Sequence, residues 1–480
     1  MIQSLASIPP LSVDELSELT LRSVGEGGRI VSFFGARTRD VDAAQLFVVL
    51  ADDARNLLSL ARARVEGESF PSISRLCPQA QAFEREIAEQ YGLTPEGHPW
   101  LKPLRDPGAW TKRDFFRVEG EQVHEVAVGP VHAGVIEPGH FRFQCHGEKV
   151  FHLEIALGYQ HRGIEEAMAG GPTKRSIHYA ETLAGDTSVG HATAYSQVCE
   201  SLAGCQEPAG AQALRGIALE LERLANHVGD LGALSGDIGF QPTASFCGRI
   251  RGDFLNMTAL ICGNRFGRGL AVPGGVGFSV DADRASELLR RLEAAEKETA
   301  SAVNLLWDNQ SVMARLEETG PLPLAVAVDL GVVGPAARAS GLARDLRFDR
   351  PTGIYRFAQV PVSTCASGDV FARAFVRWLE IQQSIVFVRE LLGAMPAGEI
   401  ASPLGPLAPD SVAVSLVEAW RGELCHVAIT DENGRFARYK VVDPSFHNWP
   451  ALAYAMRGQD ISDFPLCNKS FNLSYCGHDL

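Results

Sequence analysis

Short cysteine spacings are absent from this sequence. Ten cysteines occur, but no two of them form a CxxC pair: they are Cys77, Cys145, Cys199, Cys205, Cys247, Cys262, Cys365, Cys425, Cys467 and Cys476. Zinc and iron–sulfur sites nearly always use such spacings, so we expect no metal site of this kind. The cysteines are therefore expected to be free thiols that pack as small core residues.

The sequence also lacks a basic block and a long apolar run. Its net charge is −14, and nucleic-acid binding needs clustered Lys and Arg, so no nucleic-acid partner is expected. The best candidate for a membrane helix, Leu322–Gly334, is short and contains Asp329. The first residues, MIQSLASIPPLSVDE, have no basic start followed by an apolar core. We therefore expect a cytoplasmic protein, which can still dock on a membrane complex from the cytoplasmic face.

Common catalytic fingerprints are missing as well. The sequence contains no GxSxG, no phosphate-binding P-loop, no HExxH and no GxGxxG. Its 480 residues are 46% hydrophobic and 21% charged, which is typical of a globular protein with two or three domains. Spacing alone thus predicts a helical, multi-subunit protein without an obvious active site.

The first hundred residues show mixed α and β patterns. Two apolar runs, Arg29–Phe34 and Ala44–Leu50, predict strands. Asp52–Val65 has leucines at helical spacing, which predicts a helix. Gln79–Tyr91 predicts an amphipathic helix that ends at Gly92.

The pattern changes after a polar connector. We expect a linker over residues 106–122, between an α+β domain over residues 1–105 and a second domain over residues 123–480. The second domain is expected to be mainly α-helical, with β-hairpin subdomains. Its predicted elements are strands at Glu125–Val131, His140–Gln144 and Val150–Ile155, helices at Ala211–Leu234, Ala282–Leu316 and Asp369–Leu392, and a hairpin region over Ser411–Val442.

Four titratable side chains lie in or just after the predicted hairpin. Arg162 and Glu165 are three residues apart, so on a helix they share a face, either as an exposed ion pair or within a site. His132 and His140 flank a Gly/Pro-rich turn that could place both imidazoles at the mouth of a cavity. A surface or core position is the alternative for each histidine.

Further candidates lie at two predicted helix starts. Asp186 and His191 are five residues apart and could meet around a helix N-terminus, where Asp186 is also suited to cap the helix. Asp443 and His447 belong to VVDPSFHNWP near the C-terminus. His447 is a candidate proton carrier near pH 7, or simply a loop residue.

Long stretches of the chain resemble two known protein families. Phe70–Leu104, with FEREIAEQYG and PEGHPWLKPL, resembles the small peripheral-arm subunit of respiratory complex I. Gly129–Glu166, from GPVHAGVIEPGHFRF through GYQHRGIEE, resembles the large subunit of nickel–iron hydrogenases and the complex I subunit descended from it. The same resemblance continues in LERLANH (221–227), GNRFGRGLAVPGGV (263–276), GPAARASGLARDLR (334–347), GDVFARAFVRWLEIQQS (368–384), EAWRGEL (418–424), DPSFHNWPAL (443–452) and DFPLCNKSFNLSYCGHDL (463–480). The fused arrangement is similar to the large subunit of membrane-bound, energy-converting formate hydrogenlyase and hydrogenase-4 complexes.

The resemblance implies a metal site whose ligands are missing here. Members of the hydrogenase family hold nickel and iron through four cysteine thiolates in two CxxC pairs. Those four positions are occupied by Ala184, Thr187, Ser445 and Asn448. An alanine cannot ligate a metal, and neutral hydroxyl or amide groups are poor ligands for soft metals. We therefore expect no nickel–iron centre in this chain, which would not be an active hydrogenase by itself.

In complex I, the corresponding cavity also lost its cysteines and binds the quinone headgroup. The resemblance implies quinone contacts from a histidine of the early hairpin, to which His132 and His140 belong. It also implies a tyrosine at the position of Gly185, and this half of the quinone signature is missing. The implied partners are a small iron–sulfur subunit that carries a 4Fe-4S cluster, and antiporter-like membrane subunits.

Two hypotheses follow. In the first, the chain is a nickel-free, hydrogenase-like subunit of a complex I-like, membrane-associated oxidoreductase, with electron transfer through the partner's cluster, quinone as the candidate acceptor and coupling to ion translocation. Glu165 then corresponds to the carboxylate that hydrogenases use to move protons, and His132 or His140 meets the quinone. The expected charged cavity is lined by Arg162, Glu165, Asp186, His191, Asp443 and His447. In the second, the chain is a redox-silent structural subunit, with the cavity packed shut by Phe446 and Trp449.

Overall fold

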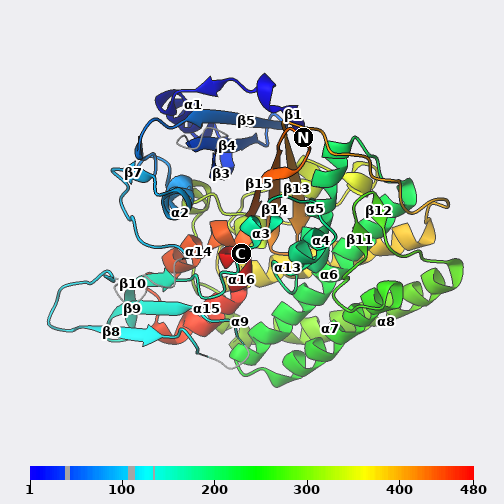
Figure 1. Cartoon of the computed structure of the whole chain (residues 1–480). Coiled ribbons are helices and arrows are strands. Elements are labelled where there is room, and N and C mark those ends of the chain that lie inside the picture. The colour runs from blue at the N-terminus through cyan, green and yellow to red at the C-terminus, as the bar shows by residue number, and fades with distance from the viewer. Residues whose placement is uncertain (38–43, 106–113, 133–135) are drawn as a thin grey trace.

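A four-stranded sheet organises the N-terminal part of the molecule. The computed structural model describes residues 1–37, 44–105, 114–132 and 136–480 (Figure 1). The sheet has the order β2-β5-β4-β3 and packs against helix α1. Strands β3 and β4 form as predicted, because their apolar runs are buried almost throughout. The elements are β2 (Pro10–Leu11), α1 (Val13–Gly25), β3 (Arg29–Arg37), β4 (Ala44–Asp52) and β5 (Leu57–Arg64).

The helix predicted over Asp52–Val65 is wrong, because most of this segment is strand β5. The strand pairs antiparallel with β4 along its whole length, and a turn through Asn56, with φ of +52°, reverses the chain between the two. Leu58 and Leu60 are two residues apart, so they share one face of the strand and pack on the N-terminal core. Pairing with β4 thus outweighs the helical spacing of the leucines.

Helix α2 (Gln81–Tyr91) confirms the amphipathic helix predicted there. Its Phe83 and Ile87 are buried, and it ends at Gly92, which adopts a left-handed φ of +69°. The short parallel strands β6 (Ser69–Pro71) and β7 (Thr94–Glu96) pair beside it.

The N-terminal residues share their core with the C-terminal sheet. Strand β1 (Ile2–Ser4) pairs antiparallel with β13, and one hydrophobic cluster joins residues of β3 and β4 to Val414 and Val427. Arg29 also forms a buried ion pair with Glu423, at 2.5 Å. The division of the chain at residues 106–122 stays a prediction, and positions 106–113 lie outside the described residues.

A three-stranded antiparallel sheet, cyan in Figure 1, confirms the strands predicted in the hairpin region. It has the order β10-β9-β8, and its buried Phe141 and Phe143 pack against the C-terminal helices. The strands are β8 (Val123–Val128), β9 (His140–His146) and β10 (Lys149–Ala156).

Long helices form the centre of the molecule. Leu214, Ile217, Leu221 and Leu224 of α6 are at most 1% exposed, as their spacing predicts. The predicted helix over Ala282–Leu316 is divided between α8 and α9. The helices are α3 (Ile164–Met168), α4 (Ser176–Glu181), α5 (Ser188–Ala203), α6 (Ala209–Asp237), α7 (Gln241–Cys262), α8 (Ala282–Trp307), α9 (Gln310–Leu316), α10 (Leu324–Asp329), α11 (Gly334–Ala339), α12 (Leu346–Asp349) and α13 (Val370–Gly393). Across the residues that the structure describes, none of the helices has the length and apolar character needed to span a bilayer.

The C-terminal region combines a buried sheet with short helices. Strands β1, β13, β14 and β15 form one sheet in this order, and β13 and β14 are buried along their whole length. The predicted turn at residues 431–434 joins β14 to β15. The elements are β13 (Ser411–Ala419), β14 (Gly422–Thr430), β15 (Phe436–Val442), α14 (Pro444–Ala455), α15 (Phe464–Phe471) and α16 (Tyr475–Asp479), with the small strands β11 (Ala271–Val272) and β12 (Gly275–Val276) preceding them. All ten cysteines are free thiols, as predicted, and most are buried.

Gly334 begins α11 where two backbones come close together. Its φ is +69°, and an added Cβ would lie 2.1 Å from the carbonyl oxygen of Arg421. We expect Gly334→Ala to lower the free energy of unfolding by about 3 kcal/mol, because left-handed strain and a backbone clash both contribute. Gly341→Ala is the matched control, with φ of +89° but no described atom closer than 3.9 Å to the added Cβ. Denaturant unfolding of both variants tests this, and equal losses would contradict the packing argument.

Candidate functional site

Two helix starts that are far apart in the sequence meet at the candidate site. The turn Ala184–Thr187 precedes α5, and Asp443 precedes α14. The Nε2 atom of His191 lies 3.2 Å from Oδ2 of Asp443, which connects the two helices directly. Trp420 and Arg421, at the tip of the β13–β14 hairpin, contact the turn before α5.

The first pair of ligand positions is closed off by the protein itself. Ala184 is fully buried and offers only a methyl group. The Oγ1 atom of Thr187 accepts hydrogen bonds from Nε1 of Trp420 at 3.1 Å and from Nη1 of Arg421 at 3.2 Å. A hydroxyl that faces a guanidinium in this way is not a ligand for a cation.

The second pair is engaged just as fully. The Oγ atom of Ser445 accepts a hydrogen bond from the backbone N–H of Ser474 at 2.8 Å. The side-chain amide of Asn448 forms two hydrogen bonds with the backbone of Val333, both at 3.0 Å. The four residues do not fit a nickel–iron centre, because none is a thiolate and the three polar side chains already hold internal partners.

The predicted capping of α5 by Asp186 is wrong. Its carboxylate instead forms a two-pronged ion pair with Arg421, at 2.6 and 2.7 Å. Burial acts to raise the pKa of Asp186, but Arg421 outweighs burial and lowers the pKa below its usual range. The N–H groups of Val189 and Gly190 at the start of α5 donate to Glu222, at 2.8 and 3.2 Å.

One edge of the site is open. Gly185 is exposed, and a Cβ added there would meet no described atom within 4 Å. Beside it, Arg162 donates to the carbonyl oxygens of Thr182 and Leu183, at 2.7 and 3.0 Å. The side chain of Asp186 is 34% exposed at the same edge. The open edge therefore presents one carboxylate and one guanidinium around a position without a side chain.

A chain of buried hydrogen bonds runs inward from Asp443. His191 Nδ1 lies 3.0 Å from His426 Nε2, and His426 Nδ1 lies 2.8 Å from the Tyr439 hydroxyl. One consistent direction satisfies every contact: Tyr439 donates to His426, His426 to His191, and His191 to Asp443. Burial, and then His191, hold the pKa of His426 well below its usual value, and burial raises the pKa of Tyr439. The array fixes the tautomer of His191 that donates to Asp443.

Glu165 lies apart from this array. Its two oxygens contact Nζ of Lys440 at 2.9 Å and Nη2 of Arg438 at 2.8 Å, beside a cavity of about 840 Å³. The prediction that Arg162 and Glu165 share a helix face is wrong, because α3 begins only at Ile164. Burial acts to raise the pKa of Glu165, but Arg438 and Lys440 hold it well below its usual range.

The two hairpin histidines lie on different sides of the small sheet. The ring of His132 lies 5.7 Å from Phe141 and 6.2 Å from Tyr475. The ring of His140 lies 5.1 Å from Phe115. Neighbouring residues of a strand point to opposite faces, so His140 faces away from Phe141 and Tyr475. His132 is therefore the histidine nearer to the segment around Tyr475, which borders the site.

His447 lies in α14, rather than in a loop, and faces the N-terminal part. Its ring is 5.7 Å from Phe83, and burial lowers its pKa to about 4, so the imidazole is neutral at pH 7. Phe446 and Trp449 are both buried, with their rings 4.9 Å from Phe83 and 5.0 Å from Tyr475 respectively. This side of the site is packed.

Comparisons with known proteins agree with this architecture. The family described as "Respiratory-chain NADH dehydrogenase, 49 Kd subunit" matches residues 237–408 and 402–479, and that described as "Respiratory-chain NADH dehydrogenase, 30 Kd subunit" matches residues 28–121. The carbon monoxide-induced hydrogenase of Rhodospirillum rubrum is 34% identical over 351 residues, which cover 73% of this chain and 97% of that protein. This chain belongs to the family of the 49 kDa subunit of respiratory NADH dehydrogenase.

Another relative matches nearly the whole chain, and a solved structure shares the fold. Formate hydrogenlyase subunit 5 of Escherichia coli is 28% identical over 480 residues, which cover 94% of this chain and 84% of that protein. A subunit of the membrane-bound sulfane sulfur reductase, an archaeal respiratory membrane complex, has the same fold, with a TM-score of 0.71 and 23% identity over 75% of this chain and 99% of that one. The resemblance to complex I and to hydrogenase large subunits is thus confirmed.

The structure brings together four of the predicted site residues, Arg162, Asp186, His191 and Asp443. It places Glu165 and His447 elsewhere. Five further residues support the site from the side away from the open edge and were not predicted from the sequence: Trp420, Arg421, His426, Tyr439 and Ser474. EAWRGEL and the last eighteen residues carried a signal for three of them, whereas nothing in the spacing pointed to His426 and Tyr439.

Proposed function

We propose that this chain is a nickel-free, hydrogenase-like subunit of a complex I-like, membrane-associated oxidoreductase. Electrons reach it through a 4Fe-4S cluster of a small partner subunit, quinone is the acceptor, and antiporter-like membrane subunits couple the reaction to ion translocation. The observation that carries the proposal is the open edge at Gly185. The side chains of Asp186 and Arg162 are accessible there to a bound small molecule. The four positions that hold nickel and iron in hydrogenases lie behind them, and their residues do not fit a metal.

The residues around the open edge suit a reaction that consumes protons. Reduction of a quinone to a quinol takes two electrons, which the partner's cluster supplies one at a time, and two protons. Asp443 and His191 lie behind the open edge as a carboxylate–imidazole pair, an arrangement that moves protons in many enzymes. Arg162 offers hydrogen-bond donors to a quinone oxygen. His132 lies on the side of the small sheet that is nearer to Tyr475.

The test uses the purified complex that contains the iron–sulfur partner. Elemental analysis is expected to find no stoichiometric nickel in this complex. The cluster is then reduced without oxygen, a short-chain quinone is added, and the paramagnetic signal of the cluster is followed. We expect rapid loss of the signal in the wild type and a rate about tenfold lower in His132→Ala, the size of one lost hydrogen bond.

Two histidine variants serve as controls. His140→Ala removes a histidine on the face of β9 that points away from Phe141 and Tyr475, and His124→Ala removes an exposed histidine of β8. Both variants are expected to react at the wild-type rate. Gly185→Tyr restores the missing tyrosine at a position with room for it, and is expected to bind quinone more tightly. A nickel content of one per complex would overturn the proposal. So would a cluster signal in the wild type that does not change when quinone is added.

A redox-silent structural role is the second candidate. The packing of Phe446 against Phe83 and of Trp449 against Tyr475 favours it, because these contacts close one side of the site. In that case the quinone has no effect on the cluster in any variant. The complex is then expected to lose its small subunit when the surface around Gly185 is altered.

A further inference from the structure

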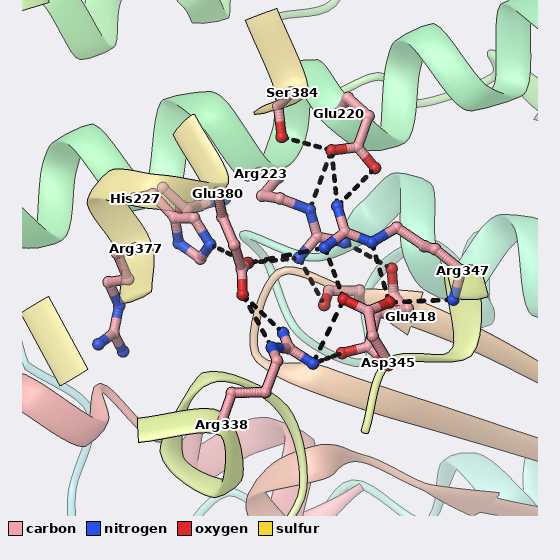
Figure 2. A network of polar contacts seen from close by, with 12 residues as sticks. Glu220, Arg223, His227, Arg338, Asp345, Arg347, Arg377, Glu380, Ser384 and Glu418 are labelled. Carbon is pink, nitrogen blue, oxygen red and sulfur yellow. Dashed lines mark hydrogen bonds and ion pairs between the residues drawn. The ribbon is translucent and has the colours of Figure 1, made fainter. Parts of the chain in front are cut away.

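A network of buried charges lies where α6 and α13 meet the tip of the β13–β14 hairpin (Figure 2). Its members come from distant parts of the chain, and each is at most 5% exposed. Among the described residues it joins three guanidinium groups to four carboxylates: Arg223, Arg338 and Arg347, with Glu220, Asp345, Glu380 and Glu418. The proposed function uses none of these groups.

The contacts within this charge network are short and direct. Arg338 lies 2.9 Å from Glu380 and 2.8 Å from Glu418. Arg347 lies 2.6 Å from Asp345. Buried ion pairs of this kind are tolerated only when the opposite charges match closely. The balance of charge therefore decides how the network behaves.

The charges do not balance. Three guanidinium groups face four carboxylates within the part of the chain that the structure describes. His227 lies 2.9 Å from Glu380, but burial lowers the pKa of its imidazole to about 4, so it supplies no positive charge at neutral pH. An ionised carboxylate without a partner in a dry interior is so costly that it takes up a proton instead. One carboxylate of the network is therefore expected to hold a proton.

The surroundings of the carboxylates indicate which one holds it. Besides its arginines, Glu220 accepts hydrogen bonds from the hydroxyls of Ser384 at 2.5 Å and Tyr355 at 2.6 Å. Glu418 has one guanidinium partner and the backbone N–H of Leu346 at 3.2 Å. Burial, and then a neighbouring carboxylate, raise the pKa of Glu418 to about 7. Glu418 is thus the least stabilised anion of the network.

We propose that Glu418 is a proton-binding site, which takes up one proton to balance the buried charge and releases it when the surrounding field changes. On release, the O–H bond of the carboxylic acid breaks, the proton passes to water, and the carboxylate stays against Arg338. The charged and titratable groups of the network that set this field are Arg223, Glu220 and His227 of α6, Arg338 of α11, Asp345 and Arg347 at α12, and Glu380 of α13. Glu207, Arg215 and Arg350 line the same small cavity as Glu418.

The hairpin tip connects this proton to the candidate site. The carbonyl oxygen of Glu418 accepts a hydrogen bond from Arg223 at 2.8 Å. Further along the tip, Trp420 donates to the carbonyl oxygen of Asp186 at 2.9 Å, and Arg421 pairs with its carboxylate. Glu418 and the two residues that contact Asp186 therefore lie in the same short turn. A role for this coupling in turnover rests on the proposed function, whereas the proton-binding site itself does not.

Infrared spectroscopy of the full chain in its complex tests the proton-binding site. A carboxylic acid and a carboxylate absorb at different frequencies, so titration from pH 5 to pH 9 follows the proton directly. Glu222, whose pKa burial raises to about 8, is expected to give one acid band in every variant. We expect a second buried acid band that disappears around pH 7 and shifts when glutamate is labelled with carbon-13. This second band is expected to be missing in Glu418→Gln. A wild-type spectrum without it, or a second band that persists in Glu418→Gln, would overturn the proposal.

Charge balance supplies a second, independent variant. Asp345→Asn removes one negative charge, so Glu418 is expected to be ionised at pH 7 and its acid band to be missing, although Glu418 is still present. Glu298→Gln, an exposed partner of Arg249, is the control and is expected to keep the wild-type band. An unchanged band in Asp345→Asn would show that the charge count does not govern this proton.

The coupling to the candidate site has its own readout, without quinone. Asp186→Asn leaves the guanidinium of Arg421 without its carboxylate, so its field is expected to lower the midpoint of the Glu418 band by about half a pH unit or more. An unchanged midpoint would refute the coupling. If only the quinone reaction is not observed, both infrared results remain valid. The proposed quinone function and the proposed proton-binding site at Glu418 are therefore tested independently.

Discussion

Arg338→Met is expected to lower the free energy of unfolding by about 3–5 kcal/mol, since breaking a buried ion pair leaves charges without a partner. Arg338 is fully buried and contacts Glu380, Glu418 and Asp345, the last at 3.5 Å. Methionine fills a similar volume but carries no charge. The network would then hold four carboxylates against two guanidinium groups, and the total stability of a domain is only about 5–15 kcal/mol.

An exposed arginine provides the matched control for this effect. Arg249 also contacts two carboxylates, Asp253 and Glu298, but its side chain is 50% exposed. Arg249→Met is therefore expected to cost less than about 1 kcal/mol. Denaturant unfolding, followed by the fluorescence of buried tryptophans such as Trp420, measures both variants. Losses of equal size would mean that the buried network contributes no more than a surface ion pair.

A double variant separates charge balance from packing. Glu418→Gln in the Arg338→Met background removes one carboxyl group, so three carboxyl groups face two guanidinium groups and the excess is one again, as in the wild type. We expect the double variant to recover part of the stability lost in Arg338→Met, because the two positions are in contact and their effects are not additive. A double variant less stable than Arg338→Met would indicate that lost packing, rather than charge, caused the first loss.

The spacing of apolar residues was sufficient to predict those helices that bury a continuous apolar face. The spacing of apolar residues in α6 and the amphipathic pattern of α2 were sufficient, because each helix buries a continuous stripe. The segment that became β5 shows the limit. Its leucines suit a helix or a strand, and only pairing with β4, which local spacing does not report, decides between them.

The candidate site shows a different limit. The resemblance located Ala184, Thr187, Ser445 and Asn448, since motifs on a shared fold keep their order along the chain. It could not reveal that Thr187, Ser445 and Asn448 are each engaged by a residue from another segment. Those contacts depend on three-dimensional positions. The charge network has the same property, since its seven members are spread from α6 to β13 and each one alone looks like an ordinary surface residue.

Glu165→Gln is expected to destabilise the chain by about 3 kcal/mol at pH 7. The substitution leaves Lys440 and Arg438, both largely buried, without the carboxylate between them. Because the pKa of Glu165 lies below its unfolded value of 4.5, its contribution is fully present above about pH 4.5. The contribution is lost as the pH falls through the folded pKa, so the difference between variant and wild type is expected to shrink in acid.

The charge state of Glu165 also determines whether this side chain can carry protons. A carboxylate held by two cations stays ionised at neutral pH, so Glu165 is expected to support the structure rather than to carry protons in this chain. Unfolding midpoints at pH 7 and pH 4 are compared with those of Glu166→Gln, whose side chain is exposed and whose loss is expected to be about 0.5 kcal/mol or less. If Glu165→Gln kept its stability and instead stopped reoxidation of the cluster by quinone, Glu165 would be the proton carrier, and the array from Asp443 to Tyr439 would be structural.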